Sequence, residues 1–414
     1  MVLYGTFRPG YAGAWKLSSN LAYVNLLRST APGCNALRAG FSPGVCNSTT
    51  WNVTGLDNNG QTVTKLGRLW FLDLKNLSEA NGITFFPFFS HGTTFAHNFN
   101  QMHNERAEVI LNVGGMQDTW IQLLKDNLNF FDPGGLDILN EPHDWNTLTG
   151  NGSYTGKYWS QMTTDGKTAL QNALKSCGGE AGYYLQYKAF IERAASALHA
   201  IKPSVILSVN PCPFWDSRQL AANPPIISGP HYFSSHLYYD GGAKIGCPMP
   251  DTSDTDYQYW IGNYAAGKTA LYNQLNTRGP GAMINAGLPV NQDEIGINGQ
   301  CYFAYGETKG HFQWLKDIFD YCKSKGVGYH YHNFGPYGTA SEQNEWGVLT
   351  ADWKQVNQIG LFWAQNLPGA AQDPVSFQSL RPVTFTVNGI QYPGGTMLTV
   401  PRGSTLQFSV PEEI

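Results

Sequence analysis

Two carboxylates stand near the ends of short apolar runs that predict buried strands. They are Glu141 in segment 136–142 (LDILNEP) and Glu294 in segment 290–296 (VNQDEIG). One carboxyl group that donates a proton and one carboxylate that attacks carbon, roughly 5–5.5 Å apart, are the pair that cleaves a glycosidic bond with retention. Asp293 is the rival of Glu294, and strand alternation predicts that only one of these two side chains faces inward. We take Glu141 and Glu294 as the candidate catalytic pair.

The elements that must hold this pair follow from the alternation of short apolar runs with longer amphipathic segments. That alternation predicts βα units and a parallel sheet. Eight runs are predicted as strands, at residues 3–7, 36–41, 83–89, 136–140, 205–209, 232–238, 290–295 and 327–331. Helices are predicted most clearly at 183–201 and 311–325. The predicted fold class is α/β, a (β/α)8 TIM barrel, whose chemistry lies at the carboxyl ends of the strands.

The pattern of the chain changes after Pro368. Residues 383–387, 398–400 and 406–410 are rich in β-forming residues and are separated by glycine-containing turns. We therefore expect two parts, a catalytic barrel over 1–370 and a C-terminal β-rich extension over 371–414. The pattern leaves open whether the extension begins an appended module or is a ribbon packed on the barrel.

Asn140-Glu141-Pro142 at the end of the fourth predicted strand, with Glu294 at the end of the seventh, resembles the clan A glycoside hydrolases, most closely the family 5 cellulases of the endoglucanase type. The resemblance covers roughly residues 1–365. It implies that Glu141 is the acid/base and Glu294 the nucleophile. It also implies that Asn140 hydrogen-bonds the 2-hydroxyl of the sugar, a contact that tightens in the transition state.

Four further residues match substrate-binding positions of that family. His236 and Tyr238 match its His-x-Tyr on strand 6, and their spacing of two places both side chains on one face of the strand. The resemblance implies that Tyr238 holds the nucleophile and that His236 contacts the acid/base or the substrate. Arg38 matches the arginine of strand 2, which would keep Glu294 ionised through a bidentate pair. His91 matches the histidine of strand 3.

The eighth predicted strand departs from the family pattern. The family usually ends this strand with a tryptophan under the sugar at the cleavage site, whereas this chain has GYHYHNF over 328–334 and Trp346 only later. A tyrosine or histidine of that run, or Trp346, is expected to take the place. Trp145, Trp215 and Trp260 are further candidates for platforms that stack on sugar rings, the alternative being packing in the core. The Asp293-Glu294 pair is also unusual before the nucleophile, so the substrate stays open.

No cofactor is expected. His330 and His332 share a strand face and, with a third ligand such as His231, would suit a metal ion, but no HExxH or similar spacing supports such a site. The formal net charge of −4 comes without a basic stripe, so nucleic acid is not an expected partner. No apolar stretch is long enough to predict a transmembrane helix. The expected partner is a polysaccharide substrate, and the oligomeric state is open.

The composition favours a secreted protein. Charged residues make up 14% of the chain and aromatic residues another 14%, a balance typical of extracellular enzymes that act on polysaccharides. The first residues show neither the charged nor the apolar region of a signal peptide, so one has been removed or never existed. The 7 cysteines are an odd number, so at least one is free or pairs outside the chain. Cys34 and Cys46 are candidates for a short disulfide loop.

The first functional hypothesis is a retaining, endo-acting hydrolase of β-1,4-glucan. Aromatic residues in the connecting loops suit several subsites in an open cleft. A β-mannanase or another clan A β-glycanase is the nearest alternative. Two other classes are a carbohydrate-binding barrel without catalysis and a metal-dependent barrel hydrolase. The carboxylates at the ends of two predicted strands disfavour the binding barrel, because hydrolysis needs both of them.

Overall fold

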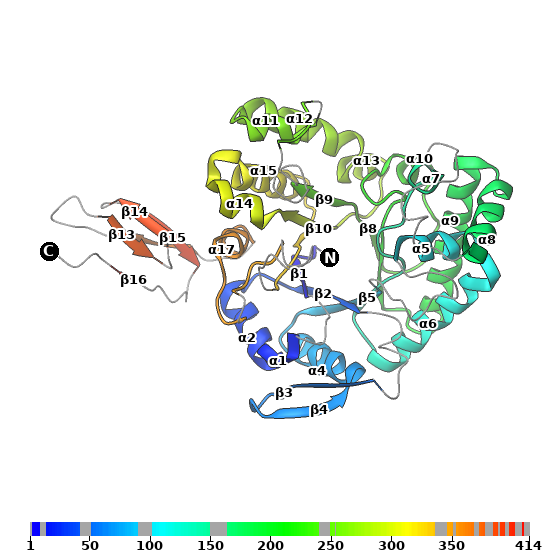
Figure 1. Ribbon diagram of the computed structural model, residues 1–414, viewed down its shortest axis with the longest axis horizontal. Helices are drawn as coiled ribbons and strands as arrows, with labels where there is room; N and C mark the ends of the chain where they lie inside the picture. The colour runs from blue at the N-terminus through cyan, green and yellow to red at the C-terminus, as the bar shows by residue number, and fades with distance from the viewer. Residues whose placement is uncertain are drawn as a thin grey trace.

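The computed structural model describes residues 2–8, 14–41, 51–89, 102–149, 164–239, 249–252, 254–335, 346–350, 353–367, 372–376, 384–387, 390–393, 397–401 and 408–409. Within them, a ring of strands is surrounded by helices (Figure 1). The strands of the ring are β1 (Gly5–Arg8), β2 (Ala36–Phe41), β5 (Thr84–Phe89), β6 (Gly135–Asp137), β7 (Ile206–Val209), β8 (His231–Phe233), β9 (His236–Tyr239), β10 (Gln292–Ile297) and β11 (Tyr329–Tyr331).

The pairings within this ring are all parallel. One run has the order β5-β2-β1-β11-β10-β9, and a second has the order β6-β7-β8. A parallel bridge from Phe233 to Val290 joins the second run to the chain just before β10, and β5 lies against β6. The predicted (β/α)8 barrel is therefore confirmed. Its parallel arrangement brings the carboxyl ends of the strands to one mouth.

The sixth barrel strand is not the continuous strand that was predicted over 232–238. It is divided into β8, which pairs with β7, and β9, which pairs with β10. The two residues at the break are Ser234 and Ser235, and their side chains hydrogen-bond to residues of β10. Ser234 Oγ donates to the Asp293 carboxylate, and Ser235 Oγ donates to Oε1 of Gln292 at 3.1 Å. The Ser234 N–H also donates to the Val209 carbonyl oxygen at 3.0 Å, so these side-chain contacts add to the backbone bonds at the break.

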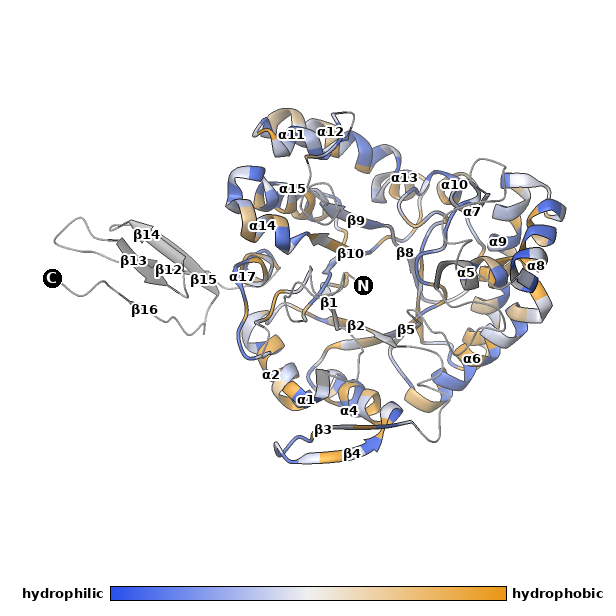
Figure 2. Ribbon diagram, in the orientation of Figure 1, coloured by the Kyte–Doolittle hydropathy of each residue, from blue (hydrophilic) through white to orange (hydrophobic). Residues whose placement is uncertain are grey.

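Helices cover the outside of the ring. The longer ones are α2 (Asn20–Thr30), α4 (Gly67–Ala80), α5 (Met102–Ile110), α6 (Met116–Phe131), α8 (Thr164–Ser176), α9 (Gly179–His199), α12 (Tyr264–Thr277), α15 (His311–Ser324) and α17 (Gln358–Gln365). Short helices are α1 (Ala14–Leu17), α7 (Trp145–Thr149), α10 (Arg218–Ala222), α11 (Asp256–Trp260), α13 (Pro280–Asn285) and α14 (Gly299–Tyr305). The two predicted helices are confirmed as α9 and α15. Hydrophilic and hydrophobic residues alternate along the outer helices (Figure 2), as one buried face requires.

The C-terminal segment is β-rich, as predicted, but it has more strands than the pattern indicated. β12 (Gln372–Ser376) pairs with β15 (Met397–Pro401), and β13 (Thr384–Val387) pairs with β14 (Ile390–Pro393) and β16 (Phe408–Ser409). All of these pairings are antiparallel. The predicted strands correspond to β13, β15 and β16. The division of the chain at residue 370 stays a prediction.

The cysteines correct one expectation. Cys34 is a buried free thiol whose Sγ lies 3.3 Å from the Ala36 carbonyl oxygen, so the predicted Cys34–Cys46 disulfide is wrong. Cys301 is disulfide-bonded. Across the described part of the chain, no helix combines the length and apolar character that a membrane span requires.

Candidate active site

Three donors surround the carboxylate of Glu294, whose side chain is only 4% exposed. Arg38 on β2 donates from Nη1 to Oε1 at 2.6 Å. The Tyr238 hydroxyl on β9 donates to Oε2, and Nδ1 of His236 lies 3.2 Å from the same oxygen. Contacts of this kind stabilise the negative charge and fix the direction of the carboxylate. The predicted contacts of Arg38 and Tyr238 with Glu294 are present, whereas the contact of His236 with Glu294 was not predicted.

The Arg38 guanidinium is fully buried and divides its contacts among several acceptors. Only Nη1 reaches Glu294, so the predicted bidentate pair is wrong. Nη2 donates to Asp137 Oδ2 at 2.8 Å and to Asn140 Oδ1 at 3.2 Å, and Nε lies 3.7 Å from Asp293 Oδ2. Burial lowers the pKa of Arg38, but the anions of Asp293, Glu294 and Asp137 outweigh burial and raise it well above its usual value. One permanent cation therefore neutralises part of a buried cluster of acids.

Glu141 follows β6 and is held by its backbone. Its φ of 50° lies in the left-handed region, where a residue other than glycine is strained unless its surroundings fix it. The Glu141 N–H donates to Asn210 Oδ1 at 3.0 Å, and Arg106 Nη1 donates to the Glu141 carbonyl oxygen at 2.6 Å. Arg106 Nη1 is also 3.7 Å from Glu141 Oε2, and the side chain of Glu141 is 18% exposed. Glu141 is therefore the more open of the two candidate catalytic carboxylates.

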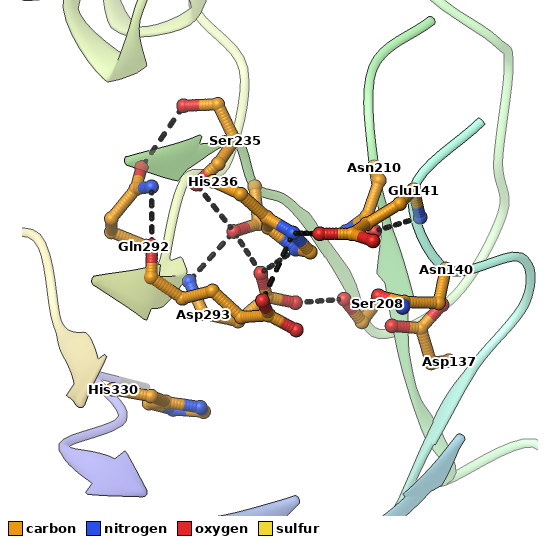
Figure 3. A network of polar contacts seen from close by, with 12 residues as sticks. Asp137, Asn140, Glu141, Ser208, Asn210, Ser235, His236, Gln292, Asp293 and His330 are labelled. Carbon is orange, nitrogen blue, oxygen red and sulfur yellow. Dashed lines mark hydrogen bonds and ion pairs between the residues drawn. The ribbon is translucent and has the colours of Figure 1, made fainter. Parts of the chain in front are cut away.

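His236 lies between the two glutamates, and Figure 3 shows its contact with Glu141. Its Nδ1 lies 2.9 Å from Glu141 Oε1 and 3.2 Å from Glu294 Oε2. On the other side of the ring, Nε2 lies 3.2 Å from Asp293 Oδ1. Burial lowers the pKa of His236, but Glu294, Asp293 and Glu141 together raise it to about 10. At neutral pH the ring is therefore an imidazolium.

Asp293 and Glu294 both enter this network, which contradicts the prediction that only one faces inward. The register of β10 against β11 shifts between Gln292 and Ile295. Such a bulge removes the strict alternation of side chains. Asp293 is fully buried, and its carboxylate accepts from Ser208 Oγ at 2.6 Å and from Ser234 Oγ. Burial raises the pKa of Asp293, but Arg38 and His236 outweigh burial and hold it far below its usual value.

Two side chains lie where the family pattern departs at the end of β11. His332 Nδ1 is 4.0 Å from Glu294 Oε2, and its ring meets the Tyr238 ring edge-on at 5.8 Å between centroids. The Trp346 ring lies 4.7 Å from that of Tyr238 and beside Gly296, where an added Cβ would come within 3.1 Å of it. Burial lowers the pKa of His332 to about 4, so this ring is neutral. Both side chains thus line the site near Glu294.

The other predicted platforms differ in exposure. Trp215 is 41% exposed, and its ring lies 6.0 Å from that of His143, two residues after Glu141. Trp145 is partly buried, with its ring 6.4 Å from that of Tyr183. Trp260 is only 7% exposed and is covered by the Lys309 ammonium at 4.7 Å, so its assignment as an open platform is wrong. His91 lies outside the described residues.

The set of His231, His330 and His332, which the sequence spacing did not support, does not form a group of metal ligands. Nδ1 of His231, at the start of β8, lies 2.8 Å from the Gly229 carbonyl oxygen, whereas His330 lies within β11 and His332 directly follows it. His330 is buried apart from the Glu141 and Asp293 group in Figure 3. Among the described residues, Glu141, His236 and Glu294 do have ligand atoms within 4.8 Å of one another. They are the two candidate catalytic carboxylates and the histidine that lies between them.

Sequence reasoning missed several residues that support the site. Asp137 and Asn210 follow the strand-end rule that identified Glu141, and they were overlooked although the rule applies to them. Burial raises the pKa of Asp137 to about 6, against the opposing effect of Arg38. Ser208 and Arg106 carry no comparable signal, because a serine in a strand and an arginine in a helix are common in any barrel.

No family model matches the sequence, and no curated protein sequence is similar to it. Solved structures are similar. An endocellulase from Pyrococcus horikoshii in complex with cellotetraose is 16% identical, with a TM-score of 0.55, over 89% of this chain and 92% of that chain. The catalytic domain of the major endoglucanase from Xanthomonas campestris is 16% identical, with a TM-score of 0.52, over 89% and 95%. A β-glucanase from Saccharophagus degradans with cellotetraose is 13% identical, with a TM-score of 0.54, over 89% and 88%. At these identities the likeness is one of fold: this chain has the barrel that these endoglucanases share.

Proposed function

We propose that this protein is a glycoside hydrolase that cleaves β-1,4-glucan within the polymer and retains the anomeric configuration. The observation that carries the proposal is the pair Glu141 and Glu294, whose nearest carboxylate oxygens lie within 4.8 Å of each other at the barrel mouth. Retaining enzymes keep their two carboxyl groups roughly 5–5.5 Å apart, whereas inverting enzymes need roughly 6.5–9.5 Å to admit a water molecule. The observed spacing suits direct attack on carbon by one of the two.

The surroundings assign a role to each carboxylate. Glu294 receives Arg38 and Tyr238 as donors and is almost fully buried, which suits a nucleophile that must be charged and directed. Glu141 is 18% exposed; its Oε2 lies 3.7 Å from Arg106, and its Oε1 lies 2.9 Å from His236, a ring that it shares with Glu294. A carboxyl group open to the cleft can exchange its proton with the leaving group and then with water. Glu141 therefore acts as the acid and then as the base.

The reaction takes two displacements. Glu141 gives its proton to the glycosidic oxygen while Glu294 attacks the anomeric carbon, so that the bond to the leaving sugar breaks and a glycosyl ester forms. Glu141 then takes a proton from water, the water oxygen attacks the same carbon, and the ester bond breaks. Because Oδ1 of Asn140 accepts from Arg38, the side-chain nitrogen Nδ2 of Asn140 is the group left to donate to the 2-hydroxyl.

Cellulose-type substrate and action outside the cell belong to the same proposal. Two structures that share this fold are an endocellulase and a β-glucanase, each in complex with cellotetraose. The exposed Trp215 close to the Glu141 segment supplies an apolar face for a sugar ring. The disulfide at Cys301 fits an oxidising compartment. Hydrolysis of carboxymethylcellulose against galactomannan separates this proposal from the β-mannanase alternative.

Azide rescue tests the two roles against each other. In Glu294→Ala, azide fills the space of the lost carboxylate and attacks a dinitrophenyl β-cellobioside once, which gives the α-glycosyl azide. In the matched variant Glu141→Ala, the glycosyl ester still forms with this good leaving group, and azide attacks from the opposite face to give the β-glycosyl azide. A β-glycosyl azide from Glu294→Ala and an α-glycosyl azide from Glu141→Ala would show that the two glutamates have the opposite roles. If azide restored activity in neither variant, the proposal would be refuted.

A further inference from the structure

We propose that Asp293 is a positioning residue for catalysis, which holds the His236 ring as a cation between the two catalytic carboxylates. The inference rests on the proposed roles of Glu141 and Glu294. Asp293 is the residue directly before the nucleophile, and the bulge in β10 turns it inward beside Glu294. It is therefore a third carboxylate within the same buried network.

Asp293 is built in as a fixed anion. Ser208 and Ser234 donate to its two oxygens, and the Ser234 hydroxyl also accepts the Asp293 N–H at 2.6 Å. These contacts come from β7 and from the break between β8 and β9, so they hold the carboxylate in one orientation. In that orientation, Oδ1 lies 3.2 Å from His236 Nε2. The break in the sixth strand thus positions the partner of the histidine.

The ring of His236 has acceptors on both sides. Nε2 faces Asp293, and Nδ1 faces one oxygen of Glu141 and one of Glu294. A neutral imidazole has a single N–H, whereas the imidazolium presents a proton at each nitrogen. The protonated ring therefore has an anion within ion-pair distance of each nitrogen, Asp293 at 3.2 Å from Nε2 and Glu294 at 3.2 Å from Nδ1. The three carboxylates also raise the pKa of His236 to about 10 against the effect of burial.

Other titratable groups face His236 from each neighbouring element. They are Asp137 and Glu141 at the end of β6, Asp293 and Glu294 on β10, and His332 after β11. His332 is held neutral by burial, which lowers its pKa to about 4. Asp137 contacts Arg38 and not His236, so Asp293 is the acid outside the catalytic pair that touches the ring.

A cation in this place serves both displacements. When Glu141 gives up its proton and Glu294 becomes an ester, one negative charge leaves Glu294 and one appears on Glu141. The two oxygens lie 2.9 Å and 3.2 Å from the same nitrogen of His236, so the cation faces the charge before and after the step without moving. Asp293 takes no part in the bond changes and keeps the ring protonated throughout.

The test is the protonation of His236, followed by NMR of ¹⁵N-histidine in the full chain. The His236 signals are assigned by their loss in His236→Gln. In the unmodified protein, both ring nitrogens are expected to carry protons up to at least pH 8. In Asp293→Asn, the titration midpoint is expected to fall by about 1–3 pH units, the effect of losing an anion in contact. The matched variant Asp137→Asn removes a neighbouring buried acid that does not touch the ring, and the midpoint is expected to fall by much less.

A neutral His236 in the unmodified protein at pH 7 would overturn the inference, and this result needs no variant to fold. Equal shifts in Asp293→Asn and Asp137→Asn would also overturn it, because the effect would then be general to the network. The alkaline limb of kcat/KM on an aryl β-cellobioside should move to lower pH in Asp293→Asn. The NMR result stands without turnover, so failure of the hydrolase proposal and failure of this inference are separate outcomes.

Discussion

Arg38 and Glu294 are joined by a contact of 2.6 Å between Nη1 and Oε1, although 256 positions separate them in the chain. Their strands β2 and β10 lie on different sides of the barrel mouth and are connected through β1 and β11. The side chain of Arg38 is completely buried and also contacts Asp137. One side chain therefore links the nucleophile to Asp137 at the end of β6, and its loss affects both chemistry and stability.

Arg38→Met is expected to abolish most activity and to lower the free energy of unfolding by roughly 3–5 kcal/mol, because buried carboxylates lose their counter-ion. The guanidinium is fully buried, so its loss affects the fold as well as the chemistry. Chemical denaturation measures the effect. Arg218→Met is the control, since Arg218 is 60% exposed in its ion pair with Asp216 and should cost little. Equal free energies of unfolding in Arg38→Met and Arg218→Met would show that the buried carboxylates do not depend on Arg38.

Glu141→Gln is expected to lose about 10²–10⁴-fold in kcat/KM on a glucan, the usual contribution of general acid catalysis. The loss should be much smaller on an aryl β-glycoside with a good leaving group, which departs without a proton. The measurement is a comparison of kcat/KM on the two substrates. A uniform loss on both would show that Glu141 is not the acid.

The pH dependence of stability follows from His236, whose pKa is raised to about 10 from its usual 6.5. Its stabilising contribution is complete below about pH 6.5 and is lost as pH rises toward 10, because the folded chain holds a proton that the unfolded chain releases. Across that window the contribution should fall by roughly 1 kcal/mol per pH unit. Denaturation at pH 7, 8 and 9 should show this slope in the unmodified protein and a flatter one in His236→Gln. If stability fell with pH equally in the unmodified protein and in His236→Gln, the His236 ring would not carry the charge.

Trp215→Ala tests the aromatic platform. Trp215 is 41% exposed, so its removal should leave the melting temperature nearly unchanged and raise KM for cello-oligosaccharides by about 5- to 20-fold, the effect of losing roughly 1–2 kcal/mol of apolar contact. Trp363→Ala is the contrast, since Trp363 is fully buried and its loss should cost roughly 3–5 kcal/mol of stability. An unchanged KM in Trp215→Ala would show that no sugar stacks on this ring.

The sequence was sufficient to predict the barrel because apolar runs of strand length recur along the chain. The resemblance to the family also predicted that Arg38 and Tyr238 contact Glu294 and that His236 contacts the acid/base or the substrate, and strand ends in a parallel barrel meet at one mouth. The inward turn of Asp293 was not predictable, since it depends on a shift of register between β10 and β11 that no residue type announces. The division of the sixth strand at Ser234-Ser235 depends in the same way on a partner, Asp293, that is distant in sequence.

The contact partners of Arg38 show a second limit. Its residue type and strand position indicated an ion pair with Glu294, yet the geometry of the fork was decided by Asp137 and Asn140 from β6 and the segment after it. Exposure was equally hidden, since Trp215 and Trp260 look alike in sequence, and only packing against Lys309 distinguishes the buried ring from the open one.

The configuration of the first product shows whether Glu294 forms a covalent intermediate with the sugar. Hydrolysis of a β-linked cello-oligosaccharide is followed by proton NMR from the first minutes, before the anomers equilibrate. Two displacements at one carbon, the first by Glu294 and the second by water, restore the original configuration. The β-anomer is therefore expected to appear first, and the α-anomer only later, at the rate of spontaneous mutarotation. Initial release of the α-anomer would contradict the covalent mechanism and the role of Glu294.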